Sequence, residues 1–227
     1  MKTGRLFVVA TPIGNLSDIT LRALEVLKNV SYILSEDTRE THKLLEKYEI
    51  SASQISYRDQ NHTKVLPKII QILNTGSDVA LVSDSGTPLI SDPGFKLISE
   101  LLDQGYNVES IPGPSALISA LVSSGLPTDK FSFVGFLPRS SGQIVKILTS
   151  YGNSDSTLII YESPFRVEKL LNYIKDTLGD RQVVLAKELT KIHEKFYRGT
   201  TSEVLDEIKG KKHKGEFVVL VAKEGFK

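Results

Sequence analysis

The sequence contains no cysteine among its 227 residues. Disulfide bonds, thiolate nucleophiles and cysteine-ligated zinc sites are therefore excluded. No apolar run approaches the roughly eighteen residues of a membrane-spanning helix. The first apolar run, Leu6 to Ala10, has only the length of a strand and does not resemble a signal peptide. We therefore expect no membrane partner and a cytoplasmic location.

Several sequence patterns that bind phosphates or metals are also missing. The chain has no G-x-x-x-x-G-K-[ST] segment and no G-x-G-x-x-G, which argues against a nucleoside triphosphate or dinucleotide site. The four histidines are separated by about twenty residues or more, so the local spacing of a zinc site is absent and no metal is expected. The absence of G-x-S-x-G weakens a hydrolase interpretation.

Charge is nearly balanced over the whole chain, with a formal net charge of +1. This value does not indicate a nucleic-acid-binding protein. The first 113 residues hold 11 Lys and Arg against 14 Asp and Glu, whereas the remainder holds 17 against 13. Either this is ordinary surface variation, or a polyanion would contact the second half first.

Strand-length apolar runs alternate with amphipathic helical patterns along the chain. This alternation predicts a mostly parallel sheet with helices on both faces in the first half. A small, polar break at Ser123 to Pro127 predicts a domain boundary, with domains at 1–123 and 124–227. The expected fold class is therefore two α/β domains with mostly parallel or mixed sheets. The expected strands are 6–11, 30–35, 55–57, 78–83, 107–111, 131–136, 157–161, 183–186 and 217–222.

Polar loops follow four of the strands expected in the first half. Because the carboxyl ends of parallel strands meet at one edge of a sheet, we expect these loops to gather there. The loop after the 78–83 strand contains Gly86 and short polar side chains, so it can turn sharply and bring its backbone close to a ligand. The pattern favours a small-molecule site; the alternative is an ordinary strand-to-helix connection. The four loops are Pro12–Asn15, Glu36–Arg39, Asp84–Asp92 and Pro112–Ser115.

These loops resemble those of the tetrapyrrole methylase superfamily, whose members bind S-adenosyl-L-methionine in a cleft between two α/β domains. Within it, six motifs that span nearly the whole chain are similar, in order, to a bacterial family of small-subunit ribosomal RNA 2′-O-methyltransferases. The resemblance implies methylation of a cytidine ribose in 16S ribosomal RNA within the small ribosomal subunit, and a homodimer. The motifs are Ala10–Leu16, Glu36–Arg39, Leu81–Gly94, Pro112–Ala116, Tyr161–Arg166 and Glu188–Lys191.

The chain departs from this family pattern in two places. Where the family usually shows two histidines before an asparagine, this chain reads Tyr57-Arg-Asp-Gln-Asn61, which argues against proton transfer at that position. The family usually continues into a basic helical tail, whereas this sequence ends at Lys227. RNA affinity that depended on such a tail would be missing here.

The resemblance also implies which residues bind the donor. Asp84 is expected to hydrogen-bond donor hydroxyls, unless it only caps the turn. Tyr161 and Phe136 are expected to flank the adenine or a flipped nucleotide, unless they are core residues. The full set of expected donor-binding residues is Pro12, Gly14, Ser83, Asp84, Ser85, Gly86, Pro88, Ile90, Pro112, Ser115, Ala116 and Tyr161.

Methyl transfer from a sulfonium requires alignment of the acceptor oxygen and removal of a proton. Glu36 is the candidate nearest the ribose hydroxyl, and Arg39 is a candidate phosphate ligand. Alternatively, Asp37 caps the next helix while Glu36 and Arg39 pair with each other. Lys187, Glu188 and Lys191 form a second candidate set, of which Lys187 and Glu188 are the catalytic candidates.

Three alternatives stay open. Glu188 and Lys191 could equally form a structural ion pair. The basic Lys209 to Gly215 segment could contact phosphate or be a solvated turn. The whole protein could be a small-molecule tetrapyrrole (uroporphyrinoid or precorrin) methylase, or a non-catalytic module that binds S-adenosyl-L-methionine or RNA.

Overall fold

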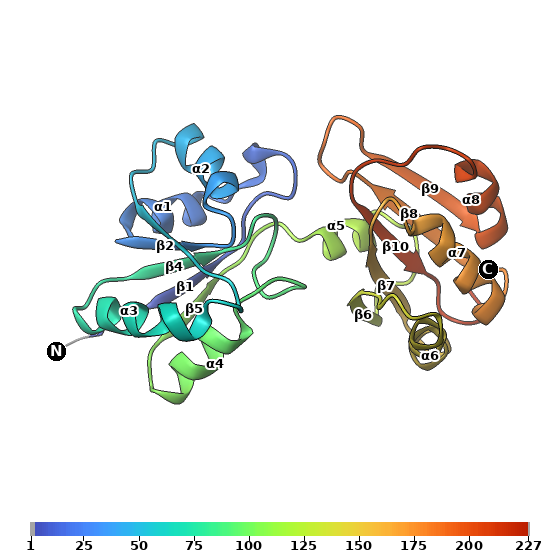
Figure 1. Cartoon of the computed structure of the whole chain (residues 1–227). Coiled ribbons are helices and arrows are strands. Elements are labelled where there is room, and N and C mark those ends of the chain that lie inside the picture. The colour runs from blue at the N-terminus through green and yellow to red at the C-terminus, as the bar shows by residue number, and fades with distance from the viewer. Residues whose placement is uncertain (1–2, 227) are drawn as a thin grey trace. The chain divides into compact units, whose positions relative to one another are not determined.

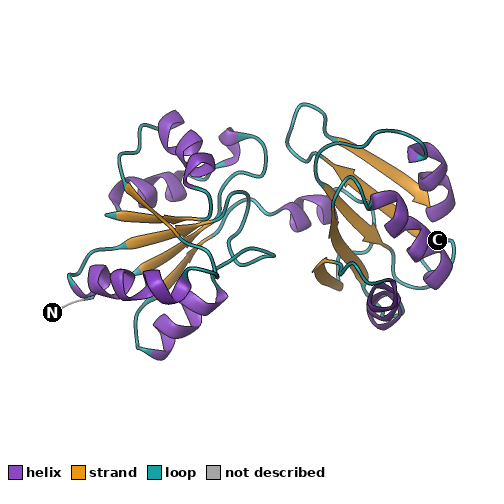
Figure 2. Ribbon diagram, viewed as in Figure 1, coloured by secondary structure: helices purple, strands orange, loops and turns teal. Residues whose placement is uncertain are grey.

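The computed structural model describes residues 3–226 and consists of two compact units, the first ending at Ser115 and the second beginning at Ala116 (Figure 1). Each unit contains a five-stranded sheet with helices packed against it, so the expected class of two α/β domains is confirmed (Figure 2).

The boundary lies before helix α5 (Ala116–Val122) rather than after it, where the break at residue 123 had placed it. α5 belongs to the second unit because it packs against strand β10 (Phe217–Val221) and buries Leu117, Ala120 and Leu121. Arg198 also ties the end of this helix to the second unit, since it donates a hydrogen bond of 2.7 Å to the carbonyl of Ser123.

The sheet of the first unit is entirely parallel, with strand order β3-β2-β4-β1-β5. Every residue of β1 and β4 is buried, as expected of strands covered on both faces. The strands are β1 (Leu6–Val9), β2 (Tyr32–Ser35), β3 (Ser53–Ser56), β4 (Val79–Val82) and β5 (Val108–Ile111). The helices are η1 (Leu16–Asp18), α1 (Leu21–Asn29), α2 (Thr38–Lys47), α3 (His62–Asn74) and α4 (Phe95–Asp103).

Two hydrophobic cores lie on the two faces of this sheet, because alternate residues of each strand point in opposite directions. Phe7 and Val9 join the core formed with α1 and α2. Leu6 and Leu81 join the core formed with α3 and α4. Helices on both faces leave the edge at the carboxyl ends of the strands to the loops.

The sheet of the second unit is mixed, with strand order β6-β7-β10-β8-β9. β6 and β7 are parallel, whereas β10 is antiparallel to β7 and β8, and β9 is antiparallel to β8. One face is covered by three helices, α6 (Ser141–Gly152), α7 (Val167–Leu178) and α8 (Thr201–Ile208). The remaining strands are β6 (Phe131–Phe136), β7 (Thr157–Glu162), β8 (Gln182–Lys187) and β9 (Lys195–Thr200).

Within residues 3–226, no helix combines the length and the apolar character needed to cross a bilayer.

Candidate functional site

The four strand-end loops of the first unit are joined directly to one another. Thr11 and Gly86 exchange two backbone hydrogen bonds, of 2.8 and 3.1 Å. The hydroxyl of Thr87 donates to the carbonyl of Pro114 at 3.0 Å. The backbone N–H of Asp37 donates to Asp84 Oδ1 at 2.8 Å. The expectation that these loops gather at one edge of the sheet is therefore confirmed, and the loop after β4 contacts the other three.

Two glycines permit this close approach. A Cβ at Gly86 would lie 3.2 Å from Ile13 Cγ2, and the residue has a φ of +82°, which side chains rarely adopt. A Cβ at Gly113 would lie 3.1 Å from the Cβ of Ala10. A side chain at either position would crowd these neighbours, which would have to shift by a few tenths of an ångström.

The loop between β4 and α4 also holds two non-glycine residues in the left-handed region. Leu89 has a φ of 72° and Ser91 a φ of 69°. Such conformations cost roughly 1–3 kcal/mol and persist where the surroundings enforce them, often in ligand-binding loops. Leu89 packs against the core under α3 and α4, and the N–H of Gly94 donates to Asp59 Oδ1 at 3.3 Å. The loop is thus fixed at its far end as well.

Carboxyl groups converge on this edge, and two of them have raised pKa values. Burial is the main cause for Glu36, and the nearby charges of Asp84 and Asp92 raise its pKa further. Burial also raises the pKa of Asp92 to about 6, with the Ser83 side chain opposing and Asp84 adding to the rise. Both carboxyls can therefore take up a proton more readily than a solvated carboxylate.

Asp92 was not expected to take part in the site, although it lies in the Leu81–Gly94 motif. Its proximity to Glu36 depends on the pairing of β2 with β4, which a linear motif does not show. Arg58 was also missed. Its Nε donates to the carbonyl of Glu36 at 3.0 Å, and its charge lowers the pKa of Glu36.

Arg39 pairs with Asp37 and not with Glu36. Its guanidinium reaches Asp37 Oδ2 at 2.6 Å and Oδ1 at 3.0 Å. The same carboxylate caps α2 by accepting the backbone N–H of Arg39 at 2.9 Å, and these contacts hold its pKa well below the usual range. Glu36 is therefore left without the arginine partner that the alternative had assigned to it.

The segment that departs from the family pattern is held to the core by its first residue, Tyr57. The hydroxyl of the buried Tyr57 lies 2.9 Å from His62 Nδ1, and His62 Nε2 lies 3.0 Å from Glu100 Oε1. Asn61 accepts the N–H of Arg58 at 2.9 Å and so closes its own turn. These contacts support a structural role for the segment.

In the second unit, Glu188 and Lys191 form an ion pair that also includes Glu216. Lys191 Nζ lies 3.0 Å from Glu188 Oε1 and 2.9 Å from Glu216 Oε2. Burial raises the pKa of Glu188, but the hydrogen bonds from Lys191 and from the N–H of Glu216 outweigh it, so the net shift is downward. Lys187 Nζ lies 6.0 Å from the centroid of the Phe217 ring. The arrangement matches the structural alternative for this pair.

Tyr161 anchors the start of α5. Its hydroxyl accepts the N–H of Leu117, the residue after Ala116, at 3.1 Å. Its ring packs edge-on against Phe133 and Phe136, with centroid distances of 4.8 and 5.6 Å. Phe136 is 60% exposed, so one side of this aromatic cluster is open to solvent.

The remaining expected donor-binding residues divide by exposure. Ser83 is buried and its hydroxyl donates to the carbonyls of Ser85 and Gly86, at 3.3 and 3.4 Å, so it shapes the loop. Pro12 and Pro88 are buried. The exposed or partly exposed positions are Gly14, Ser85, Ile90, Pro112, Ser115 and Ala116. Across residues 3–226, no group of three or more His, Cys, Asp or Glu side chains could hold a metal ion.

The family model described as Tetrapyrrole (Corrin/Porphyrin) Methylases matches residues 5–205. Three similar proteins carry the name Ribosomal RNA small subunit methyltransferase I. The Thermotoga maritima protein is 46% identical over 219 residues, covering 96% of this chain and 98% of that protein. The Hydrogenobaculum protein is 45% identical, with 97% and 96% covered. The Halalkalibacterium halodurans protein is 43% identical, with 99% and 78% covered.

Solved structures with the same fold are less similar in sequence. The methyltransferase CobJ superposes with a TM-score of 0.73 at 17% identity, covering 99% of this chain and 96% of that chain. Uroporphyrin-III C-methyltransferase from Thermus thermophilus, complexed with S-adenosyl homocysteine, gives a TM-score of 0.66 at 19% identity, with 97% and 98% covered. At these identities the likeness shows the fold alone.

Proposed function

This chain belongs to the tetrapyrrole methylase family, and from that premise we propose that it transfers the methyl group of S-adenosyl-L-methionine to small-subunit ribosomal RNA. The observation that carries the proposal is the 46% identity to a ribosomal RNA small subunit methyltransferase over almost all of both chains. The name of that relative specifies RNA, whereas the family description and the similar folds do not distinguish RNA from tetrapyrroles.

The strand-end loops of the first unit have the features that a donor site needs. Glycine positions and tight loop contacts leave backbone groups close together around Gly86 and Gly113. Asp84 is exposed and can accept hydrogen bonds from donor hydroxyls. The backbones of 85–88 and 112–115 would hold the methionine part. When bound, the donor supplies an activated methyl group on a sulfonium.

The acceptor that we propose is the 2′-hydroxyl of a cytidine ribose in 16S ribosomal RNA. Glu36 is the candidate group for taking up the hydroxyl proton. Its pKa is raised toward neutral pH, which makes it a stronger base than a solvated glutamate. Arg39 is 86% exposed at its side chain and is the candidate for a contact with an RNA phosphate. Lys187 and Glu188 are the catalytic candidates from the second unit. The ion pairs of Lys191 with Glu188 and Glu216 favour a structural role for Glu188.

We also propose that the protein works as a homodimer in the cytoplasm and acts on the small ribosomal subunit. A 2′-hydroxyl distinguishes RNA from DNA, and a base or ribose within folded RNA must be presented out of its helix or loop. A partly assembled subunit, in which the RNA can still present this ribose, is therefore the substrate that we propose.

Radiolabelled donor, incubated with the protein and either small ribosomal subunits or a uroporphyrinoid, tests the proposal. We expect label in the RNA, recovered after nuclease digestion as 2′-O-methylcytidine. Label on the macrocycle alone would replace the proposal with a tetrapyrrole methylase. Donor or RNA binding without any transfer would indicate a non-catalytic module.

A further inference from the structure

Two loops of the second unit, which are about fifty residues apart in sequence, meet where strand β7 ends and strand β10 begins. β7 ends where β10 begins, because the two strands are antiparallel and Glu162 pairs with Phe217. The loop that leads from β7 into α7 therefore lies beside the loop that leads from α8 into β10. The first contains Pro164 and Phe165, and the second is the basic Lys209 to Gly215 segment.

An open hollow of about 690 Å³ lies between these loops. Its lining combines an aromatic ring with a cluster of cations, and this combination is what sets it apart from an ordinary surface depression. The residues that line it are Pro164, Phe165, Glu168, Lys211, Lys212, His213, Lys214 and Gly215.

Phe165 contributes a ring that the fold does not use. It is 92% exposed, although it lies only two residues before α7, whose first residue, Val167, is buried in the core. A phenylalanine left in water contributes almost nothing to folding. A flat, exposed π-surface is what nucleic-acid bases stack on, whatever their sequence.

The lysines of the hollow are free to bind an anion. Lys211, Lys212 and Lys214 are exposed, and within residues 3–226 none of them forms an ion pair. Glu168 is the one carboxylate in the lining. Three cations against one anion give the hollow a positive charge, which the nearly neutral whole chain does not suggest.

The basic loop is held at both ends. His213 Nε2 lies 3.0 Å from the carbonyl of Ile208, and its ring packs edge-on against Phe217. At Gly215 a side chain would overlap the carboxyl of Glu188, which accepts the N–H of Glu216 at 3.0 Å. The ion pair of Glu188 with Lys191 and Glu216 therefore fixes the end of this loop, and the lysines are presented from an anchored backbone.

We propose that this hollow is a binding site for single-stranded RNA, in which one base stacks on Phe165 and neighbouring phosphates contact Lys211, Lys212 and Lys214. The proposal rests on the proposed function, since it supplies that activity with an RNA contact in the second unit. An acidic protein surface would also meet the lysines, but it would leave the exposed ring without a flat partner, so RNA fits better.

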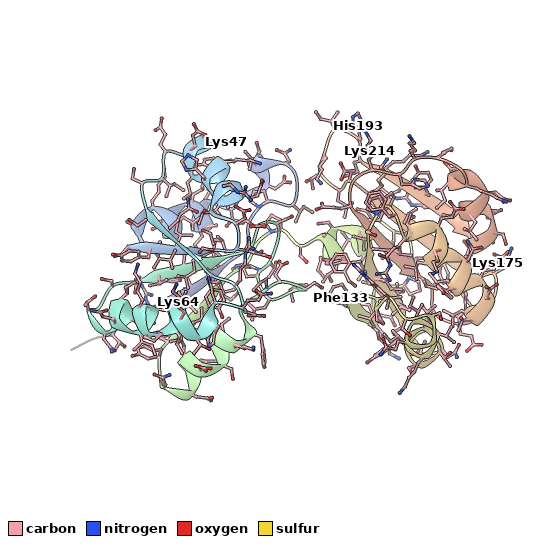
Figure 3. All side chains as sticks on the ribbon, viewed as in Figure 1. Lys47, Lys64, Phe133, Lys175, His193 and Lys214 are labelled. Carbon is pink, nitrogen blue, oxygen red and sulfur yellow. The ribbon has the colours of Figure 1, made fainter. Side chains whose placement is uncertain are left out.

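Two sets of variants test the site in the full chain. The first is Lys211→Ala/Lys212→Ala/Lys214→Ala, matched by Lys64→Ala/Lys146→Ala/Lys175→Ala, which removes the same charge from exposed lysines elsewhere. Figure 3 shows Lys175 and Lys214 well apart in the second unit. The second set is Phe165→Ala, with Phe165→Tyr as the control that keeps the ring.

The readout is the affinity for a short single-stranded oligoribonucleotide at several salt concentrations. Each phosphate contact contributes roughly 0.7 to the slope of log affinity against log salt, so we expect the hollow triple variant to lose about 2 from that slope while the matched triple variant keeps it. We expect Phe165→Ala to weaken binding roughly five- to a hundredfold, with Phe165→Tyr close to the unsubstituted protein.

Equal losses in the two triple variants would overturn the proposal, since they would show diffuse electrostatic attraction. An unchanged RNA affinity in Phe165→Ala would overturn it as well. Polyglutamate serves as a probe for an acidic protein surface: a hollow triple variant that binds RNA normally but has lost affinity for polyglutamate would also overturn the proposal. Thermal unfolding midpoints check that the exposed substitutions leave the fold intact.

Methylation assays on small ribosomal subunits separate this proposal from the proposed function. If both stand, the hollow triple variant raises KM for the subunit and leaves kcat unchanged. If the protein methylates RNA and KM does not change, only the RNA site is wrong. If the oligonucleotide binds at the hollow and no methyl group is transferred to RNA, only the proposed function is wrong.

Discussion

At the scale of single residues, Asp84 has two roles that a substitution can separate. Its Oδ1 accepts the N–H of Asp37, and we propose that the same carboxylate accepts hydroxyls of the donor. We expect Asp84→Ala to weaken donor binding about ten- to a hundredfold, since a hydrogen bond to a charged group contributes roughly 1.5–3 kcal/mol. Calorimetric titration with S-adenosyl-L-methionine measures this.

Asp84→Asn is the matched control, because its amide oxygen can still accept the N–H of Asp37. An intermediate affinity in this variant would show that the charge itself contributes to donor binding. Unchanged donor affinity in Asp84→Ala would remove Asp84 from the donor site and leave it as the link between two loops.

The raised pKa of Asp92 has a consequence for stability. A carboxyl whose pKa is about 6 in the folded protein and near its ordinary value of 3.8 when unfolded binds its proton more tightly in the folded state. Stability therefore falls as the pH rises from about 4 to about 6; the cost is absent below this window and complete above it. Because the side chain is partly solvated, we expect a cost of about 1–2 kcal/mol.

Asp92→Asn should remove this cost, so the variant should gain stability relative to the unsubstituted protein across the same window. Urea unfolding at pH 4, 5, 6 and 7 measures the difference. Asp176→Asn, at an exposed position of α7, provides the baseline. A difference between Asp92→Asn and the unsubstituted protein that stays constant with pH would contradict the expectation.

The sequence identified the strand-end loops but not the pairings within them. Asp37 as a helix cap and Asp84 as a donor ligand were expected from their motifs, whereas Asp92 was missed. The pairing of Arg39 with Asp37 and the raised pKa of Asp92 depend on burial and on neighbours brought together by the fold. Local spacing carries no information about either.

At the scale of secondary-structure elements, α8 begins with a capping box. The hydroxyl of Thr200 accepts the N–H of Glu203 at 3.3 Å, while Glu203 Oε2 accepts the N–H of Thr200 at 2.8 Å. We expect Thr200→Ala to destabilise the protein by about 1 kcal/mol, as loss of such a cap does elsewhere. Urea unfolding measures it, with Thr63→Ala, exposed in the first turn of α3, as the control. Equal effects would show that the cap contributes little.

Elements with a clear apolar run or amphipathic pattern in the sequence were predictable, and elements without such a pattern were not. β4 and β10 are buried throughout and correspond to the apolar runs in the sequence. β9 was not expected, because it is an edge strand in which Tyr197 is buried while Lys195 and Arg198 are exposed. Its pairing with β8 compensates for the missing hydrophobic signal.

At the scale of the whole molecule, the chain can be divided before α5 or after it, and the two divisions predict fragments of different stability. A fragment beginning at Ala116 keeps the packing of α5 on β10, whereas one beginning at residue 124 uncovers that face of the sheet. The shorter fragment also loses the hydrogen bond from the N–H of Leu117 to the hydroxyl of Tyr161. We expect the longer fragment to resist urea better by several kcal/mol, since burial of a side chain such as Leu117 or Leu121 contributes roughly 1.5–3 kcal/mol.

Equal unfolding midpoints for the two fragments would contradict this division. The break in the sequence at Ser123 to Pro127 was a real loop signal, but a loop marks the end of an element and not the unit to which the element belongs. Only the buried side of α5, together with the bond from Arg198 to the Ser123 carbonyl, assigns the helix to the second unit. The α/β class, in contrast, followed from the alternation of strands and helices, and the division into two domains from this break.

The double backbone bridge between Thr11 and Gly86 makes the first and central loops one cooperative piece. Substitutions at these two positions should therefore have non-additive energetic effects, and a double-mutant cycle would measure the interaction energy directly. A variant with altered donor specificity would then require matched changes in both loops, since a change in either one alone disturbs its neighbour.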